Sequence, residues 1–247
     1  MSFQTVFKRY ELKYLLTNDQ KESVLSAMLA YMRPDEYGKT NIRNIYFDTD
    51  TFLLIRRSIE KPIYKEKLRI RSYGKADTDS VVFVELKKKY KHIVYKRRIS
   101  LPNNEATAWL SGNKCPQKNT QIADEINYFL KLYGTLHPTV FLSYEREAYY
   151  SKDGSDFRVT FDDNILCRQE GLSLQADIYG ERLLPEGMVL MEIKCGGGIP
   201  LWMTDILSKE KIYKTSFSKY GTAYKTLIFP QNHKINSYNM LEVTANV

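Results

Sequence analysis

The sequence lacks several features that define large protein classes. Its apolar stretches, such as Met188–Met191 and Leu227–Phe229, are far shorter than the roughly 20 residues that span a bilayer. The N-terminus has no signal-peptide apolar core. We therefore expect no transmembrane segment and a cytoplasmic location, with any membrane tether supplied by a partner.

Cysteine and histidine are scarce, with three of each, and they are scattered along the chain. This dispersal predicts reduced thiols and argues against a disulfide framework or a zinc site built from histidine and cysteine. The phosphate-binding patterns GxGxxG and GxxxxGK[ST] are absent, so the usual nucleotide-binding loops are excluded.

What the chain does have is a sizeable apolar fraction and an excess of positive charge. Of its 247 residues, 43% are hydrophobic, which is enough for a proper core. The formal net charge of +8 favours an anionic partner without naming it. We expect a single domain over residues 1–229, followed by an irregular tail over 230–247.

Strand-like segments dominate the chain. Eight are rich in Val, Ile, Tyr and Phe and mostly alternate, at 7–16, 42–48, 65–74, 80–90, 92–101, 138–150, 156–162 and 187–194. Helices are predicted after a capping box at 17–20 and over 104–111, 120–133, 201–211 and 219–228. Because many strands follow one another directly, we expect antiparallel pairing and an α+β fold.

Seven of these strands have one charged side and one largely apolar side. In 65–72, the shared side holds Lys65, Lys67, Arg69 and Arg71. The corresponding sides of other strands hold Glu11 and Lys13, Glu85 and Lys87, Lys96 and Arg98, Tyr144 and Arg146, Arg158 and Asp162, and Glu192 and Lys194. Any single charged side could simply face water.

Like charges about 5 to 7 Å apart on one sheet face repel, so seven such sides suggest an enclosed lining. We therefore predict a closed antiparallel β-barrel tunnel of about eight strands with helices packed outside. The ligand would carry many negative charges in a row, as a phosphate chain does. The inward acids would either pair with neighbouring cations or hold Mg²⁺ or Mn²⁺ against phosphate oxygens.

Seven spaced motifs strengthen this interpretation. They are Phe7–Tyr14, Tyr46–Thr49, Leu68–Gly74, Val84–Lys87, Tyr144–Arg146 followed by Arg158, Met191–Lys194, and Ser218–Tyr220. In this order they resemble the catalytic domain of the vacuolar transporter chaperone (VTC) polyphosphate polymerases, within the triphosphate tunnel metalloenzyme (CYTH-like) superfamily. The resemblance covers residues 7–228 and implies a basic tunnel for ATP and a growing polyphosphate chain.

The resemblance also implies roles for individual residues. The catalytic group would be Arg69, Arg71, Lys87, Arg158 and Lys219, and the phosphate-binding group would add Lys13, Arg57 (or its neighbour Arg56), Lys96, Arg98, Arg146, Lys194 and Ser218. Tyr144 would lie beside the nucleotide base, and Glu192 and Glu11 would hold Mn²⁺ or Mg²⁺. The expected partners are ATP and inorganic polyphosphate, with no nucleic acid.

Two departures from the family pattern bear on the reaction. Hydrolytic members begin with ExExK, whereas this chain has Arg9-x-Glu11-x-Lys13, and Ser216 replaces a lysine of the KxSK pattern. A cation in place of the first carboxylate favours transfer to phosphate over transfer to water. We therefore expect an ATP-dependent polyphosphate polymerase; the alternatives are a tripolyphosphatase or nucleoside triphosphatase, or a non-catalytic polyphosphate-binding module.

Overall fold

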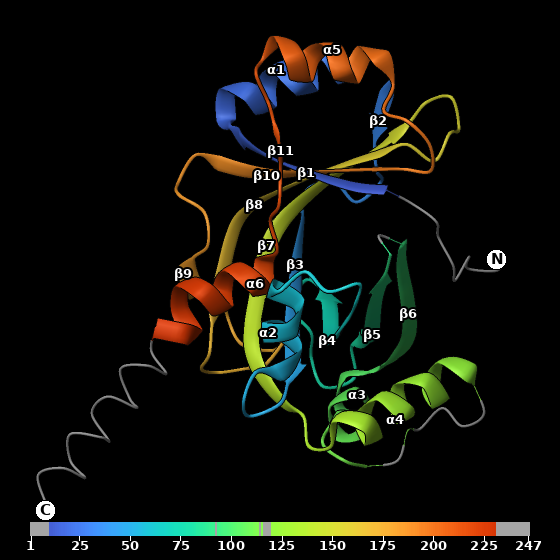
Figure 1. The fold of residues 1–247 in the computed structure, drawn as a ribbon, viewed down its shortest axis with the longest axis vertical. Helices are drawn as coiled ribbons and strands as arrows, with labels where there is room; N and C mark the ends of the chain where they lie inside the picture. Colours follow the sequence, from blue (N-terminus) through green and yellow to red (C-terminus); the bar gives the residue numbers. More distant parts are fainter. Residues whose placement is uncertain (1–9, 92, 114, 116–119, 231–247) are drawn as a thin grey trace, which may run out of the picture.

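The computed structural model describes residues 10–91, 93–113, 115 and 120–230. Within these residues, eleven strands form one antiparallel sheet in the order β11-β1-β10-β8-β7-β3-β4-β5-β6, with β2 beside β7 and β9 beside β8 (Figure 1). The eight long strands are β1 (Tyr10–Thr17), β3 (Thr40–Asp48), β4 (Tyr64–Tyr73), β5 (Val81–Tyr90), β6 (Ile93–Pro102), β7 (His137–Ser151), β8 (Arg158–Arg168) and β10 (Met188–Cys195).

All eight predicted strands are therefore confirmed, and the antiparallel α+β prediction is correct. The main difference in length is β8, which continues to Arg168. The alternation did not reveal three short strands, which are β2 (Met32–Pro34), β9 (Glu181–Arg182) and β11 (Lys214–Thr215). The predicted tail over 230–247 and the first residues of the 7–16 strand lie outside the described residues, apart from Pro230.

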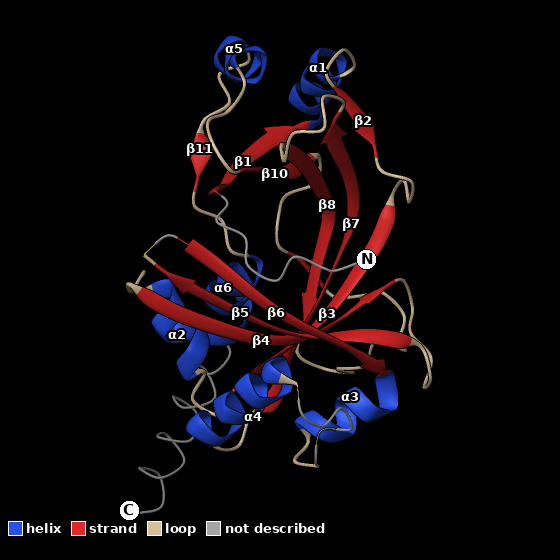
Figure 2. Cartoon of the chain, turned by 90° about the vertical axis from the view of Figure 1, so that its right-hand side faces the viewer, coloured by secondary structure: helices blue, strands red, loops and turns tan. Residues whose placement is uncertain are grey.

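The sheet is strongly curved but is not closed, so the predicted barrel of about eight strands is wrong (Figure 2). The path of paired strands ends at β11 and at β6. β11 pairs with the outer edge of β1 at Lys13 and Tyr14, so at these two residues β11, and not β6, is the neighbour of β1. Side-chain alternation predicts which residues share a face, but it contains no information on how the two edges of a sheet are paired.

Four helices cover the convex side of the sheet (Figure 2). The apolar residues of the strands gather on this side. α1 (Asn18–Met28) and α5 (Leu201–Lys209) pack over β1, β10 and β8, and α3 (Asn103–Leu110) and α4 (Gln121–Tyr133) pack over β4, β5 and β6. The capping box predicted at Thr17 is present, with reciprocal bonds between Thr17 and Gln20. No helix in the described ranges is both long and apolar enough to cross a bilayer.

The remaining helices occupy a different position. α2 (Leu53–Ile59) and α6 (Lys219–Ala223), which continues as a π-helix over Tyr224–Ile228, form a cluster with residues of β3 and β7. This cluster includes Tyr46 and Tyr144, which lie on the concave side of the sheet. The expectation that all helices pack outside the sheet is therefore wrong for α2 and α6.

Candidate functional site: the basic concave face

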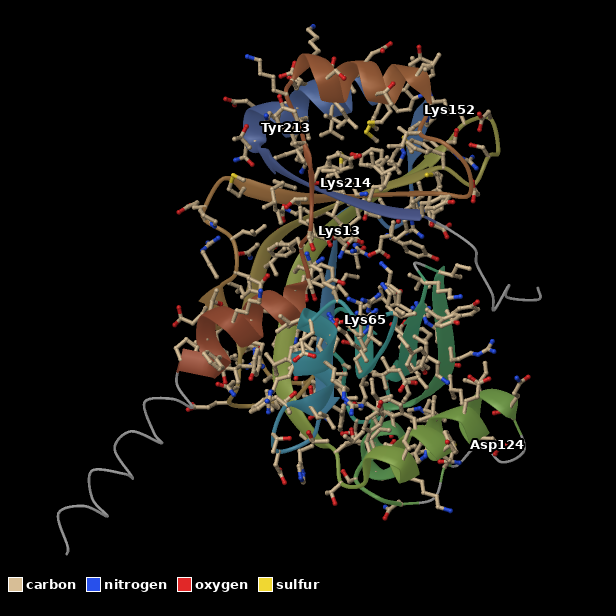
Figure 3. All side chains as sticks on the ribbon, in the orientation of Figure 1. Lys13, Lys65, Asp124, Lys152, Tyr213 and Lys214 are labelled. Atoms are coloured by element: carbon tan, nitrogen blue, oxygen red, sulfur yellow. The ribbon has the colours of Figure 1, made fainter. Side chains whose placement is uncertain are left out.

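The strand registers bring the predicted charged sides together on the concave side of the sheet. We call this surface the basic concave face. Its basic members are Lys13, Lys65, Lys67, Arg69, Arg71, Lys87, Lys89, Lys96, Arg98, Arg146, Arg158, Lys194 and, from α6, Lys219; its acidic members are Glu11, Glu85, Asp162 and Glu192. Among the described residues, the face thus combines thirteen cations with four carboxylates. Lys13 and Lys65, labelled in Figure 3, come from the two halves of the curved sheet.

Glu85 organises one half of the face. Its side chain is 1% exposed, and it accepts hydrogen bonds from Arg69 at 2.8 and 2.7 Å and from Arg98 at 2.7 and 2.5 Å. The Lys96 ammonium lies 2.7 Å away. Burial alone would raise the pKa of Glu85, but the surrounding arginines and lysine hold this pKa well below its ordinary value. Glu85 is therefore an ion-pair partner that fixes the directions of these cations.

Asp162 and Glu192 play the same part in the other half. Asp162 is fully buried and accepts from Arg146 at 2.5 and 2.6 Å and from Lys219 at 2.5 Å. Glu192 lies 3.1 to 3.7 Å from Lys13, Lys194, Arg146 and Lys219. Burial opposes ionisation, yet these cations lower the pKa of both carboxyl groups. Both groups are therefore charged at neutral pH.

In the described ranges, four basic residues of the face have no carboxylate within ion-pair distance, namely Lys65, Lys67, Lys89 and Arg158. Lys67 donates to the Ser218 hydroxyl at 3.0 Å, and burial together with Lys13 and Lys87 lowers its pKa to about 7. Arg158 has a buried Nε with no hydrogen-bond partner, and burial also lowers its pKa. A buried cation without a partner is costly. The face is therefore electrostatically incomplete without a bound anion.

Side chains bridge the two halves where no strand ladder does. Lys87 on β5 donates to Glu11 on β1 at 3.2 Å. The segment before α6 adds two further contacts, because Lys13 donates to the Phe217 carbonyl at 2.9 Å and Lys67 reaches Ser218. Glu11 is paired in this way, and its pKa is lowered by Lys87 and Lys13 against the effect of burial.

The structure brings together nearly all of the predicted site residues, including Ser218 and Tyr144, but not the arginines of α2. Arg57 is exposed and its charge acts on Tyr133, which packs on the convex side, and Arg56 points toward the carbonyl of Thr51. Tyr144 is 3% exposed, and its ring lies 4.4 Å from the Lys219 ammonium and 5.1 Å from the Arg146 guanidinium.

Several residues of the site were not assigned a role from sequence. Asn44 and Tyr46 on β3 accept hydrogen bonds from Arg71 at 2.9 Å and from Arg69 at 2.8 Å. Tyr220 stacks on Tyr46 and donates to Asp48 at 2.9 Å. The motifs contained Tyr46, Asp48 and Tyr220, but the contacts that give them a role join segments far apart in the chain.

The carboxylates of the face have the right chemistry for a divalent metal, since hard oxygen ligands suit Mg²⁺ and Mn²⁺. The described residues contain no group of three or more metal-ligating side chains. Mg²⁺ is commonly held by one or two carboxylates together with substrate phosphates, which is compatible with Glu11 and Glu192 as candidate ligands.

Comparison with known proteins agrees with this geometry. The curved antiparallel sheet defines the fold class, and the basic concave face is the surface on which a polyanion would bind. The VTC domain model matches residues 8–228, so the chain belongs to the VTC domain family. The family and the fold together support phosphoryl-transfer chemistry. No curated protein matches the chain.

Two solved structures share the fold at low sequence identity. A proposed adenylate cyclase from Bacillus halodurans has a TM-score of 0.52 and 16% identity, covering 86% of this chain and 96% of its own. HpAC1 from Hippeastrum, a proposed adenylyl cyclase described as having a dominant triphosphatase activity, has a TM-score of 0.52 and 13% identity, covering 88% of this chain and 95% of its own. At these identities the likeness concerns the fold alone.

Proposed function

We propose that this protein is a polyphosphate polymerase that transfers the γ-phosphoryl group of ATP to the end of an inorganic polyphosphate chain. The observation that carries the proposal is the basic concave face, on which thirteen cations meet four carboxylates that are already paired. Both the triphosphate of ATP and a polyphosphate are linear chains of anionic groups, so one surface of this kind suits donor and acceptor together.

In the proposed reaction, a terminal oxygen of the polyphosphate chain forms a bond to the γ-phosphorus. The bond between that phosphorus and the β–γ bridging oxygen breaks, and ADP leaves with the electron pair. The attacking oxygen is already anionic near neutral pH, so the step requires no general base. Catalysis then depends on alignment and charge neutralisation.

The residues of the face supply both requirements. Arg69, Arg71, Lys87, Arg158 and Lys219 are the proposed catalytic group. Glu85 and Asp162 hold several cations in fixed directions before substrate binds. Arg158 and Lys67, without carboxylate partners, would be neutralised by the phosphates. A divalent ion held by Glu192 and Glu11 would further neutralise charge on the phosphate oxygens.

A product assay tests the proposal directly. Purified protein is incubated with ATP and Mn²⁺ or Mg²⁺, and the products are separated on a urea gel. The polymerase predicts a ladder of long chains, which should be lost in Arg71→Ala and retained in the surface control Arg182→Ala. Release of free phosphate without a ladder would refute the polymerase.

That second outcome would support the alternative reaction, hydrolysis of tripolyphosphate or a nucleoside triphosphate. The triphosphatase activity described for HpAC1, which shares the fold, favours this second candidate. The two reactions differ only in the acceptor, which is water in the hydrolase. Tight binding of polyphosphate with neither product would instead support a non-catalytic binding module.

A further inference from the structure

The basic concave face is divided by residue type along its strands. On β4, the concave residues run from Lys65 and Lys67 to Arg69 and Arg71. The antiparallel partner β5 repeats the division, because Lys89 and Lys87 lie opposite the two lysines, whereas Glu85 lies opposite Arg69. One end of the face therefore consists of lysines alone, and the other end contains the arginines, together with Lys96 at Glu85 and Lys219 at Asp162.

The lysine end comprises Lys61, Lys65, Lys67, Lys87 and Lys89. Lys65 and Lys89 lie directly opposite each other in the β4–β5 ladder. In agreement with this, burial and the charges of Lys89 and Lys61 lower the pKa of Lys65. Within the described parts of the chain, Lys61, Lys65, Lys67 and Lys89 have no carboxylate within ion-pair distance. This end therefore offers positive charge that is not already neutralised.

The arginine end differs in two respects. Its guanidinium groups, those of Arg69, Arg71, Arg98, Arg146 and Arg158, are mostly held by Glu85 and Asp162. Aromatic rings also line it. The Arg98 guanidinium lies 4.3 Å from the Phe83 ring centre, and the Arg158 guanidinium lies 4.5 Å from that of Tyr150.

The accessible rings at this end are suited to a nucleotide base. Tyr73 is 50% exposed and Tyr150 is 39% exposed, whereas Tyr144 is nearly buried between two cations. A base stacks on an open aromatic ring, often with an arginine beside it. Tyr73 and Tyr150 therefore offer a stacking surface that Tyr144 does not.

The two kinds of cation bind phosphate differently. Arginine presents a rigid planar fork that fixes a phosphate in one orientation, whereas the lysine ammonium is a hydrated charge on a flexible stem. The reacting triphosphate needs fixed orientation, but a product chain must advance by one phosphate in each turnover. Lysines that are held only by neutral oxygens, as Lys65 is by the Ser58 carbonyl and Lys67 by the Ser218 hydroxyl, suit a segment that has to move.

From this division we infer that the face is directional: ATP binds at the arginine end with its base on Tyr73 or Tyr150, and the polyphosphate chain leaves over the lysine end. The inference rests on the proposed function, since it assigns an end of the face to each of its two phosphate chains.

Binding experiments with two opposed variants test the direction. In the double variant Lys65→Gln/Lys89→Gln, the affinity for long-chain polyphosphate should fall about tenfold or more, with a shallower salt dependence. Its affinities for tripolyphosphate and ATP should stay within about twofold of wild type. Tyr73→Ala should do the reverse. Its affinity for ATP should fall about tenfold, while its affinity for long-chain polyphosphate should stay unchanged. Lys131→Gln on α4 is the matched surface control.

Equal losses for tripolyphosphate and long-chain polyphosphate in the double variant would overturn the direction, as would an unchanged affinity for the long chain. Binding is measured without turnover, so these results do not depend on the polymerase assay. A wild-type protein that binds both ligands but makes no chain would refute the proposed function while the binding data still show which end holds the long polyanion.

Discussion

Lys67 shows how strongly the basic concave face depends on an anion. Its ammonium donates to Ser218, and four neighbouring cations, Lys13, Lys65, Lys87 and Arg69, together with burial, lower its pKa to about 7. A bound phosphate would supply the missing negative charge and raise this pKa again. Binding should therefore be accompanied by uptake of a proton near neutral pH.

We expect the affinity for long-chain polyphosphate to fall as pH rises from 7 to 9, by up to about tenfold per pH unit from Lys67 alone. Lys67→Met should remove this component, while titration of the ligand itself affects both proteins equally. Calorimetry in two buffers of different ionisation enthalpy measures the proton uptake directly. Identical pH profiles and proton uptake in the two proteins would contradict the role assigned to Lys67.

The lowered pKa of Lys67 also predicts how the stability of the protein without ligand depends on pH. Between pH 7 and the ordinary lysine value of 10.5, the unfolded chain binds a proton that the native protein does not. The contribution of Lys67 to the free energy of unfolding should therefore rise with pH across this window. Urea unfolding at several pH values should show this rise in wild type and a weaker one in Lys67→Met.

Substitution of Glu192 should affect ligand binding and ATP turnover in opposite ways. Its carboxylate lies close to four cations, so Glu192→Gln removes one negative charge and leaves those cations less neutralised. Tripolyphosphate should bind at least as tightly as in wild type, whereas ATP turnover should fall by about 10² or more. Glu186→Gln, an exposed change, is the control. Wild-type turnover by Glu192→Gln with saturating Mn²⁺ would refute the proposed metal role.

Helix α2 is capped by a residue that also holds a distant part of the chain. Its N-cap residue, Phe52, has a left-handed backbone (φ 56°) and a side chain that caps nothing. The cap comes from Asp48, which accepts from the backbone N–H groups of Leu54 and Ile55 at 2.9 and 3.0 Å. The fourth partner of Asp48, besides Thr49, is the Tyr220 hydroxyl, which ties α6 to the same carboxylate.

Removing that hydroxyl should loosen α6. Tyr220→Phe leaves Asp48 with three backbone donors, so we expect the free energy of unfolding to fall by about 2 kcal/mol. Tripolyphosphate should also bind more weakly, because Ser218 and Lys219 immediately precede Tyr220 and contact the face. Urea unfolding measures the first effect and calorimetry the second. Tyr213→Phe, an exposed change, should alter neither; equal behaviour of the two variants would contradict the anchoring role.

These elements also show which features of the site could be predicted from the sequence. Alternation in β4 predicted that Lys67 and Arg71 share a face, because a side-chain period of two is a local property. It could not place Arg57, whose direction is set by the packing of α2 on distant strands. Nor could it predict that Asp162 would hold Lys219, which is 57 residues away in the chain.

At the scale of the whole molecule, the sequence did not predict that the sheet stays open. Repulsion among cations indicated an anionic ligand, but the carboxylates Glu85 and Asp162 relieve part of that repulsion without closure of the sheet. In the structure the two halves meet through side chains and through the segment before α6, including the Lys87–Glu11 and Lys67–Ser218 contacts. A polyanion lying between the halves would add further links.

Such a ligand should therefore stabilise the whole fold. At a tripolyphosphate concentration one hundred times its dissociation constant, binding adds about 2.7 kcal/mol to the free energy of unfolding. For a chain of this size that corresponds to a rise in Tm of about 5 to 10 °C. The rise should shrink with added salt, because the contacts are ionic, and orthophosphate at equal ionic strength should give a much smaller one. A Tm that does not change with millimolar tripolyphosphate would show that the cations of the two halves do not share a ligand, and the polymerase and hydrolase proposals would both fail with it.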